Sequence, residues 1–190
     1  MRKHDVRFAM ASVFAAATLL CATVGHAQNR YGIGRAATAA EIAGWNIDVD
    51  RDGHNLPLGS GTASHGREVY EQQCAACHGS NGEGGLGDRL VGGQGTIATL
   101  KPVRTVGSFW PYAPTLFDYI RRAMPQNAPQ SLSDEDVYAV SAYVLHLNGL
   151  FPADGTLDAK ALAAIRMPNR DSFTADTRPD VKNPKCMSGC

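Results

Sequence analysis

Neither sign of charge is in excess in this sequence, because 18 Lys and Arg residues balance 18 Asp and Glu residues among 190. The basic residues form no stripe of the kind that binds nucleic acid, so no nucleic-acid partner is expected. No apolar run after residue 24 is long enough to cross a bilayer, cysteine is scarce at five residues, and no segment repeats. These absences predict one compact domain with extensions and no membrane span beyond the N-terminus.

The N-terminus has the pattern of an export signal. Three basic residues precede an apolar run over residues 8–24, and a small-residue cleavage pattern ends at Ala27. We expect residues 1–27 to be removed and the mature protein to be periplasmic. A retained membrane helix is the alternative, although the run is short and contains polar residues. Removal leaves 15 Lys and Arg against 17 Asp and Glu, a formal charge of −2.

A single C-x-x-C-H motif is present, at Cys74-Ala75-Ala76-Cys77-His78. Two cysteines at this spacing lie one helical turn apart and reach the two vinyl groups on one edge of a porphyrin, while the adjacent imidazole ligates the iron. The motif therefore predicts one covalently bound haem c, attached through Cys74 and Cys77, with His78 as the proximal ligand.

Other sites also use a C-x-x-C pair: a structural disulfide, a thioredoxin-like dithiol and half of a zinc site. None of these needs the adjacent histidine. The dithiol would further require a βαβ context, and the zinc site would require a second Cys/His pair nearby. The sequence shows neither.

Eight glycines occur within residues 79–95, directly after the motif. Gly82, Gly84 and Gly87 satisfy the dinucleotide-binding pattern, but they follow a haem motif rather than a strand. A loop that passes close to a porphyrin edge needs small residues, and we adopt that interpretation.

An acidic turn precedes the motif. Asp48, Asp50, Asp52 and Gly53 match the opening of a calcium loop, but Gly59 stands where the bidentate Glu should be. We therefore expect a solvated turn rather than a calcium site.

Met124-Pro125 offers a thioether for the distal face of the iron. Met124 follows a predicted helix and precedes a proline that stiffens the loop, as a rigidly held ligand requires. It is preferred to Met167, which is also followed by proline but comes after the last predicted core helix. The remaining possible ligands are Met187, His54 and His146.

Trp110 and Tyr112 flank a proline shortly before that helix. The indole N–H and the phenol O–H are donors that a buried haem propionate would accept, so both residues are possible propionate contacts. Ordinary aromatic packing in the core is the alternative for both.

Apolar periodicity predicts a short helix within 36–45 and further helices within 59–73, from Thr115 to 123, from Ser133 to Gly149 and over 157–165. Thr115 is expected to cap its helix with Asp118 three residues on. Ser133 is expected to cap the next helix, whose first turn is acidic and whose end is marked by Gly149.

The order of C-x-x-C-H motif, glycine loop, Met-Pro and capped helix resembles class I c-type cytochromes over residues 59–150. Three further segments extend the likeness to nearly the whole mature chain: IDVDRDG at 47–53, WPYAPTLFDYIRRAMP at 110–125 and MPNRDSF at 167–173. These segments are similar to the cytochrome subunit of Sox-type sulfane dehydrogenase and of related sulfite dehydrogenases.

The resemblance implies an all-α, class I cytochrome c fold around one haem, with extensions at both ends. The implied organisation is a signal peptide at 1–27, an N-terminal arm at 28–58, a cytochrome c domain at 59–150 and a C-terminal extension at 151–190. The tail carries Cys186 and Cys190, for which a local disulfide, a bridge to a partner and free thiols all remain open.

In that family the cytochrome accepts electrons from a molybdenum-cofactor dehydrogenase subunit and passes them to a downstream cytochrome. The resemblance implies the same partners here, and it maps the haem roles onto Cys74, Cys77, His78 and Met124. Some relatives carry two haems, whereas this chain has a motif for one.

The expected function is transfer of single electrons. With both axial positions of the iron filled, the chain is an electron-transfer subunit of an oxidoreductase rather than a catalyst on its own. The alternatives are a haem enzyme or gas-binding sensor with a labile distal ligand, and a general periplasmic electron carrier unrelated to sulfur oxidation. A binding module whose active dithiol is Cys186 and Cys190 is a further possibility.

Overall fold

The computed structural model describes residues 34–178. The predicted export signal and the tail cysteines Cys186 and Cys190 lie outside these residues. The chain divides into two compact units, Met1–Ile42 and Ala43–Cys190. No described helix is long and apolar enough to cross a membrane.

The first described helix, α2 (Ala39–Trp45), has a complete capping box. The Thr38 amide donates to Glu41 Oε2 (2.8 Å), and the Glu41 amide donates to Thr38 Oγ1 (3.3 Å). The helix therefore forms without burying any of its residues. The short helix predicted within 36–45 is confirmed.

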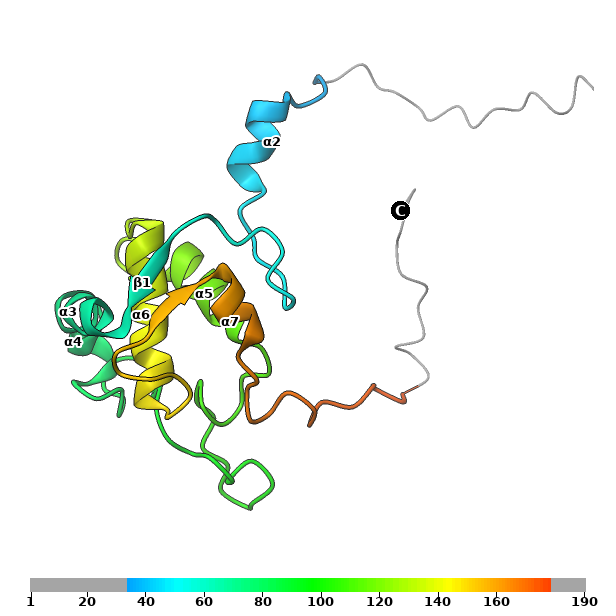
Figure 1. Cartoon of the computed structure of the whole chain (residues 1–190). Coiled ribbons are helices and arrows are strands. Elements are labelled where there is room, and N and C mark those ends of the chain that lie inside the picture. The colour runs from blue at the N-terminus through cyan, green and yellow to red at the C-terminus, as the bar shows by residue number, and fades with distance from the viewer. Residues whose placement is uncertain (1–33, 179–190) are drawn as a thin grey trace, which may run out of the picture. The chain divides into compact units, whose positions relative to one another are not determined.

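The second unit is mostly helical (Figure 1). Its helices are α3 (Ala63–Gln73), α4 (Ala75–His78), α5 (Ala113–Ala123), α6 (Asp134–Leu147) and α7 (Ala159–Ala164). Strands β1 (Ser60–Thr62) and β2 (Thr156–Asp158) also pair, antiparallel, with Gly61 opposite Leu157. The expectation of an all-α fold missed this ladder, because strands of three residues are too short to show an alternating pattern.

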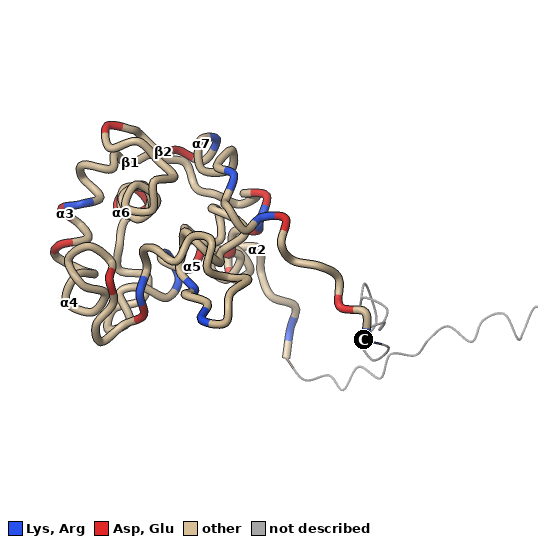
Figure 2. The backbone as a smooth tube through the Cα atoms, turned by 90° about the horizontal axis from the view of Figure 1, so that it is seen from below, with Lys and Arg blue, Asp and Glu red and all other residues tan. Residues whose placement is uncertain are grey.

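Helix α6 is the centre of the core. Every residue from Val137 to Leu145 is buried, and α3, α5, β1 and β2 all pack against the helix. Figure 2, in which α6 is seen nearly end-on, shows these elements around it. The predicted cap is confirmed, since Ser133 Oγ accepts from the Asp136 amide (3.1 Å).

Helices α3 and α6 approach closely at Gly66. A Cβ atom on Gly66 would lie 1.8 Å from the Ala139 carbonyl oxygen, so no side chain fits there. The close approach also buries Val69 and Tyr70 of α3, and the Tyr70 ring packs edge-on against Tyr143 of α6 at a centroid distance of 5.4 Å. This crossing fixes the direction in which α3 leads to the cysteines.

Helix α5 begins two residues before the predicted cap. Its N-cap is Tyr112 and Pro114 lies in the first turn, where the missing amide is not needed. The Thr115 hydroxyl instead donates to the Tyr112 carbonyl oxygen (2.7 Å), so the prediction that Thr115 caps the helix is wrong.

The core draws residues from outside the predicted limits of 59 and 150. Leu157, Leu162 and Met167 from the C-terminal side are fully buried, and Val49 from the N-terminal side joins the same cluster. The Val49 amide donates to the buried Asp118 carboxylate of α5 (2.8 Å). The helix predicted over 157–165 is shorter than expected because its first two residues belong to β2.

Replacing Gly66 by alanine tests the helix crossing. We expect Gly66→Ala to destabilise the protein by about 2–3 kcal/mol, because the new methyl group collides with backbone that cannot move aside. Chemical denaturation measures the change. Gly44→Ala is the matched control, since a Cβ atom there meets nothing within 4 Å. Equal stabilities for the two variants would contradict the close approach.

A second prediction concerns the contact between His65 of α3 and Asp136 of α6, whose Nε2 and Oδ1 atoms lie 2.7 Å apart. The hydrogen bond to Asp136 raises the pKa of His65 above 6.5. Burial opposes ionisation of Asp136, but bonds from His65 and Ser133 hold its pKa below 3.8. The pair therefore stabilises the fold most between about pH 4 and 6.5, and this stabilisation is lost as the pH rises through the pKa of folded His65.

Both side chains are partly exposed, so the coupling should be small, about 0.5 kcal/mol at pH 5.5 and near zero at pH 9. A double-mutant cycle of His65→Gln and Asp136→Asn, measured by denaturation at both pH values, gives this coupling. A coupling that is the same at both pH values would show that the charge on His65 is not involved.

Candidate functional site

The two cysteines of the C-x-x-C-H motif lie at the junction of α3 and α4. Cys74 ends α3, with its amide donating to the Tyr70 carbonyl oxygen (2.9 Å), and its own carbonyl accepts from the amides of Cys77 (3.1 Å) and His78 (3.0 Å). The two sulfurs therefore project from one tight helical turn. Cys74 is partly buried, Cys77 is exposed, and both are free thiols.

The electrostatics of Cys74 argue against a reactive dithiol. Burial, with a smaller effect from nearby Cys77, raises the pKa of the Cys74 thiol to about 11. A thioredoxin-like nucleophile requires the opposite, a thiol whose pKa is lowered towards neutrality. Cys74 therefore lacks the activation that a thioredoxin-like nucleophile needs.

The ring of His78 is held in one orientation. Its Nδ1 atom lies 2.7 Å from the Asp88 carbonyl oxygen, and since a carbonyl only accepts, Nδ1 carries the proton. In the neutral tautomer that this bond selects, Nε2 is the nitrogen with a free lone pair, and it has no hydrogen bond among the described residues, as a metal-ligating imidazole requires.

The glycine loop closes around this imidazole. The Gly84 amide donates to the His78 carbonyl oxygen and the Gly87 amide to the Cys77 carbonyl oxygen, each at 2.8 Å. A Cβ atom on Gly87 would lie 2.8 Å from His78 Cε1, so only glycine lets the loop pass. The predicted need for small residues after the motif thus has a direct cause at this position.

Met124 lies at the end of α5, where its amide donates to the Ile120 carbonyl oxygen (3.0 Å). Its side chain is partly buried and packs against the same core cluster as Cys74. The competing Met167 is fully buried in that core. His54 is exposed and bonded to Asp50 (2.6 Å), and Nδ1 of His146 lies 3.2 Å from the Phe151 carbonyl oxygen.

The two aromatic residues predicted to contact propionates have different surroundings. The Trp110 ring packs edge-on against Tyr119 at 5.8 Å. The Tyr112 ring lies against two guanidinium groups, those of Arg51 at 5.7 Å and Arg170 at 4.9 Å. Sequence reasoning missed both arginines because they are far from Tyr112 along the chain.

The acidic turn is solvated, as predicted. Asp50, Asp52 and His54 place ligand atoms within 4.8 Å of one another, but all three are exposed. Asp50 Oδ1 already accepts from the amides of Asp52 and His54, each at 2.9 Å. The acidic groups therefore close a turn through their own hydrogen bonds.

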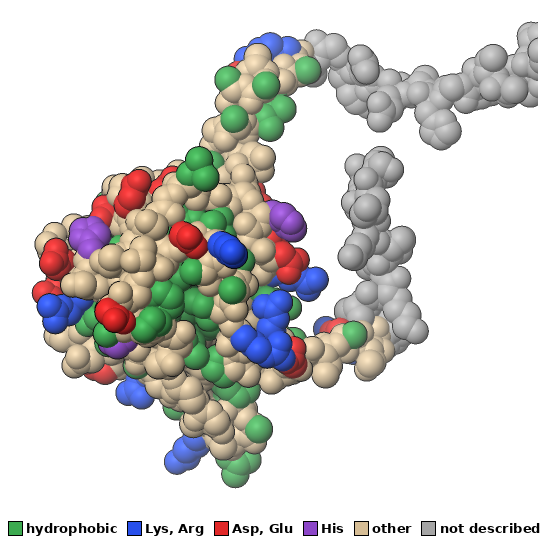
Figure 3. Space-filling view, viewed as in Figure 1, with side chains coloured by type: hydrophobic (Ala, Val, Ile, Leu, Met, Phe, Trp, Pro, Cys, Tyr) green, Lys and Arg blue, Asp and Glu red, His purple; other side chains and the backbone are tan. Residues whose placement is uncertain are grey.

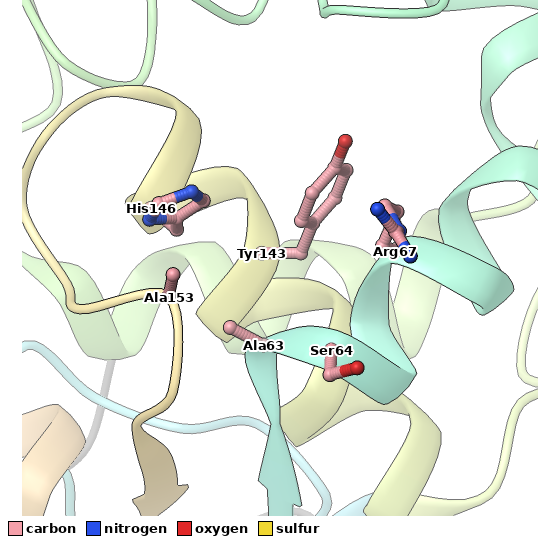
Figure 4. Close-up of a pocket in the computed structure, with 6 residues that line it drawn as sticks. All are labelled: Ala63, Ser64, Arg67, Tyr143, His146 and Ala153. Carbon is pink, nitrogen blue, oxygen red and sulfur yellow. The ribbon is translucent and has the colours of Figure 1, made fainter.

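A small pocket of about 160 Å³ lies between α3 and α6 (Figure 4). Arg67 of α3 faces Tyr143 and His146 of α6 across it, and the remaining lining residues are Ala63, Ser64 and Ala153. None of the residues predicted to bind the haem lines this pocket.

The donor set around His78 fits a covalently attached haem. Two thiols project from one helical turn, and the next residue is His78, whose imidazole is oriented by a hydrogen bond. The loop has no side chain at Gly87, so it does not crowd this imidazole. A thioether at the end of α5 packs on the same core. These groups can attach a porphyrin edge and ligate its iron.

Comparison with known proteins agrees with this chemistry. A family model described as cytochrome c oxidase, cbb3-type, subunit III, matches residues 61–144. That range contains the C-x-x-C-H motif, the glycine loop and Met124.

Two similar proteins are thiosulfate dehydrogenases. The one from Stutzerimonas stutzeri is 32% identical over 90 residues, covering 46% of this chain and 28% of the relative. The one from Allochromatium vinosum is 34% identical over 90 residues, covering 46% of this chain and 32% of the relative. The chain thus spans about a third or less of the length of these relatives.

A similar solved structure is that of the sulfane dehydrogenase SoxCD from Paracoccus pantotrophus. The identity is 38%, the TM-score is 0.74, and the match covers 84% of this chain and 81% of the other. This likeness extends well beyond the segment that the family model matches.

Proposed function

Because this chain belongs to the SoxD-like c-type cytochromes, we propose that it is the electron-accepting subunit of a periplasmic, molybdenum-dependent dehydrogenase of sulfur compounds. Membership of the family brings a haem c cofactor and a role in electron transfer. The proposal adds the number of haems, the residues that hold the haem, the partners and the compartment.

One haem is held by four residues. Cys74 and Cys77 would form the thioether bonds, and Nε2 of His78 and the sulfur of Met124 would ligate the iron. The haem supplies a one-electron Fe(III)/Fe(II) couple. The main support for this haem site is the orientation of His78. Its Nδ1 donates to the Asp88 carbonyl oxygen and leaves Nε2 as the atom that can bind iron.

The polypeptide tunes this couple through its own contacts. The bond from His78 to the Asp88 carbonyl oxygen makes the imidazole a better electron donor, and the α3–α6 core limits access of water to the buried side of Cys74. Trp110 and Tyr112 are the proposed propionate contacts, and Arg51 and Arg170 beside Tyr112 place positive charge near that point.

The extent of the SoxCD likeness supports a sulfur compound as the source of electrons. Both kinds of relative are named as dehydrogenases of sulfur compounds. The SoxCD match covers 84% of this chain, whereas each thiosulfate dehydrogenase match covers 46%. We therefore favour a sulfane or sulfite dehydrogenase, with a molybdenum-cofactor subunit as donor and a downstream cytochrome as acceptor.

Purification of the exported protein from its own host tests this function. We expect a chain that starts at Gln28, carries the added mass of one haem, and co-purifies with a molybdenum-containing subunit. Sulfite or a protein-bound sulfane should reduce the haem only when that subunit is present. Absence of the porphyrin mass would refute the haem site, and a haem protein without a molybdenum partner would indicate a general electron carrier.

Replacing Met124 tests the distal ligand. Met124→Ala should abolish the sulfur-to-iron charge-transfer band, open the iron to carbon monoxide and lower the reduction potential, because the thioether favours Fe(II). Visible spectroscopy and potentiometry measure these changes.

The matched control is Met167→Ala, which should leave the spectrum unchanged and cost about 2–5 kcal/mol of stability, since Met167 is fully buried in the core. The reverse result would assign the ligand to Met167. Binding of carbon monoxide by the wild-type protein at modest concentration would favour the haem enzyme or gas sensor.

A further inference from the structure

A loop over residues 93–103, here called the finger, projects from the helical core of the second unit. In Figure 1 it is the bright green segment at the bottom, within the long stretch without helix or strand between α4 and α5. Every residue from Ala98 to Pro102 is exposed. The assigned haem residues do not include any part of this loop.

Hydroxyl groups hold the finger in a defined conformation. Thr96 Oγ1 donates to the Gly93 carbonyl oxygen (2.7 Å) and accepts from the Val103 amide (2.9 Å), which closes the base of the loop. Thr99 Oγ1 donates to the Thr96 carbonyl oxygen (2.7 Å). At Gly93, a Cβ atom would lie 2.3 Å from the Val103 carbonyl oxygen, so the segments that enter and leave the loop are in contact.

Asn148, at the end of α6, anchors the finger to the core. Its Oδ1 accepts from the Gly92 amide (3.2 Å), its Nδ2 donates to the Leu90 carbonyl oxygen (3.1 Å), and its own carbonyl accepts from Gln94 (3.3 Å). Asn148 is itself buried. A Cβ atom on Gly107 would lie 2.2 Å from Asn148 Oδ1, so the chain leaving the finger also packs on this residue.

The tip combines an apolar group with positive charge. Leu100 is fully exposed, Lys101 beside it is exposed, and Arg104 follows at the base. No Asp or Glu occurs between Asp88 and Asp118, although the chain as a whole has equal numbers of both charges. Figure 3 shows apolar side chains at the lower tip with blue cationic groups next to them.

We propose that the finger is the docking element for the molybdenum-cofactor subunit, which would receive Leu100 in an apolar hollow rimmed by carboxylates. The inference rests on the proposed function. Burial of the fully exposed Leu100 in a concave partner would remove apolar surface from water, and the positive charge of Lys101 and Arg104 would favour an acidic rim around it.

A protruding finger fits a stable subunit better than a transient acceptor. Short-lived electron-transfer encounters use small interfaces, whereas a loop that inserts into a hollow of its partner adds contact area of the kind that lasting complexes bury. The anchoring through Leu90 also joins the finger to the segment that contains Asp88, the acceptor for His78.

Photo-crosslinking in the host cell tests the contact. A benzoylphenylalanine placed at Leu100 should give a product with the molybdenum-containing subunit, identified by mass spectrometry. The same probe at Leu58 is the matched control, since that leucine is 98% exposed and lies far from the finger in sequence. We expect no such product from the control position.

The association itself gives a second measurement. Leu100→Ser and Lys101→Glu should each weaken binding to the purified molybdenum-containing subunit by at least about tenfold, whereas Leu58→Ser should change it by less than about twofold. The visible spectrum and the reduction potential should be unchanged in all three variants, because none touches the haem residues.

The outcomes separate this inference from the proposed function. If the molybdenum subunit co-purifies but position 100 gives no product, or gives the same product as position 58, the finger is not the docking element. Crosslinking to lipid or to the downstream cytochrome also overturns the assignment. If no molybdenum subunit co-purifies, the proposed function fails and the assigned occupant fails with it.

Discussion

The contact on which this structure depends is the crossing of α3 and α6 at Gly66, where the backbones approach without a side chain between them. Because α3 ends at Cys74 and α6 ends at Asn148, this one crossing sets the position of the C-x-x-C-H turn and of the loop residues that Asn148 binds. Helix α6 can hold this central place because every residue from Val137 to Leu145 is buried.

Glycines also allow close approaches of the backbone elsewhere in the second unit. The backbone at Gly87 lies against the imidazole of His78, and the backbone at Gly107 lies against the side-chain amide of Asn148. The glycine-rich segment is therefore ordered by specific hydrogen bonds, and its composition reflects steric limits at particular positions.

Local signals could be predicted from the sequence. The C-x-x-C-H motif, the Ser133 cap and the glycine loop each depend on neighbours within a few residues. The structure confirms the Ser133 cap and shows why Gly87 must lack a side chain, while haem attachment at the motif stays a prediction. Features made by distant segments could not be predicted. The β1–β2 ladder and the two arginines beside Tyr112 join parts of the chain whose proximity no local pattern encodes. The N-cap at Tyr112 was missed because Tyr112 makes no side-chain hydrogen bond to the first turn. Pro114 in that turn has no amide N–H that would need an acceptor.

The β1–β2 ladder also joins two distant parts of the chain. By joining Ser60 to Asp158 it closes the backbone between them into a ring that contains the cysteines, His78 and Met124. Chain that precedes Ser60 or follows Asp158 lies outside this ring. The small sheet thus brings the two ends of the ring side by side, so that the segments before and after the ring start from neighbouring positions.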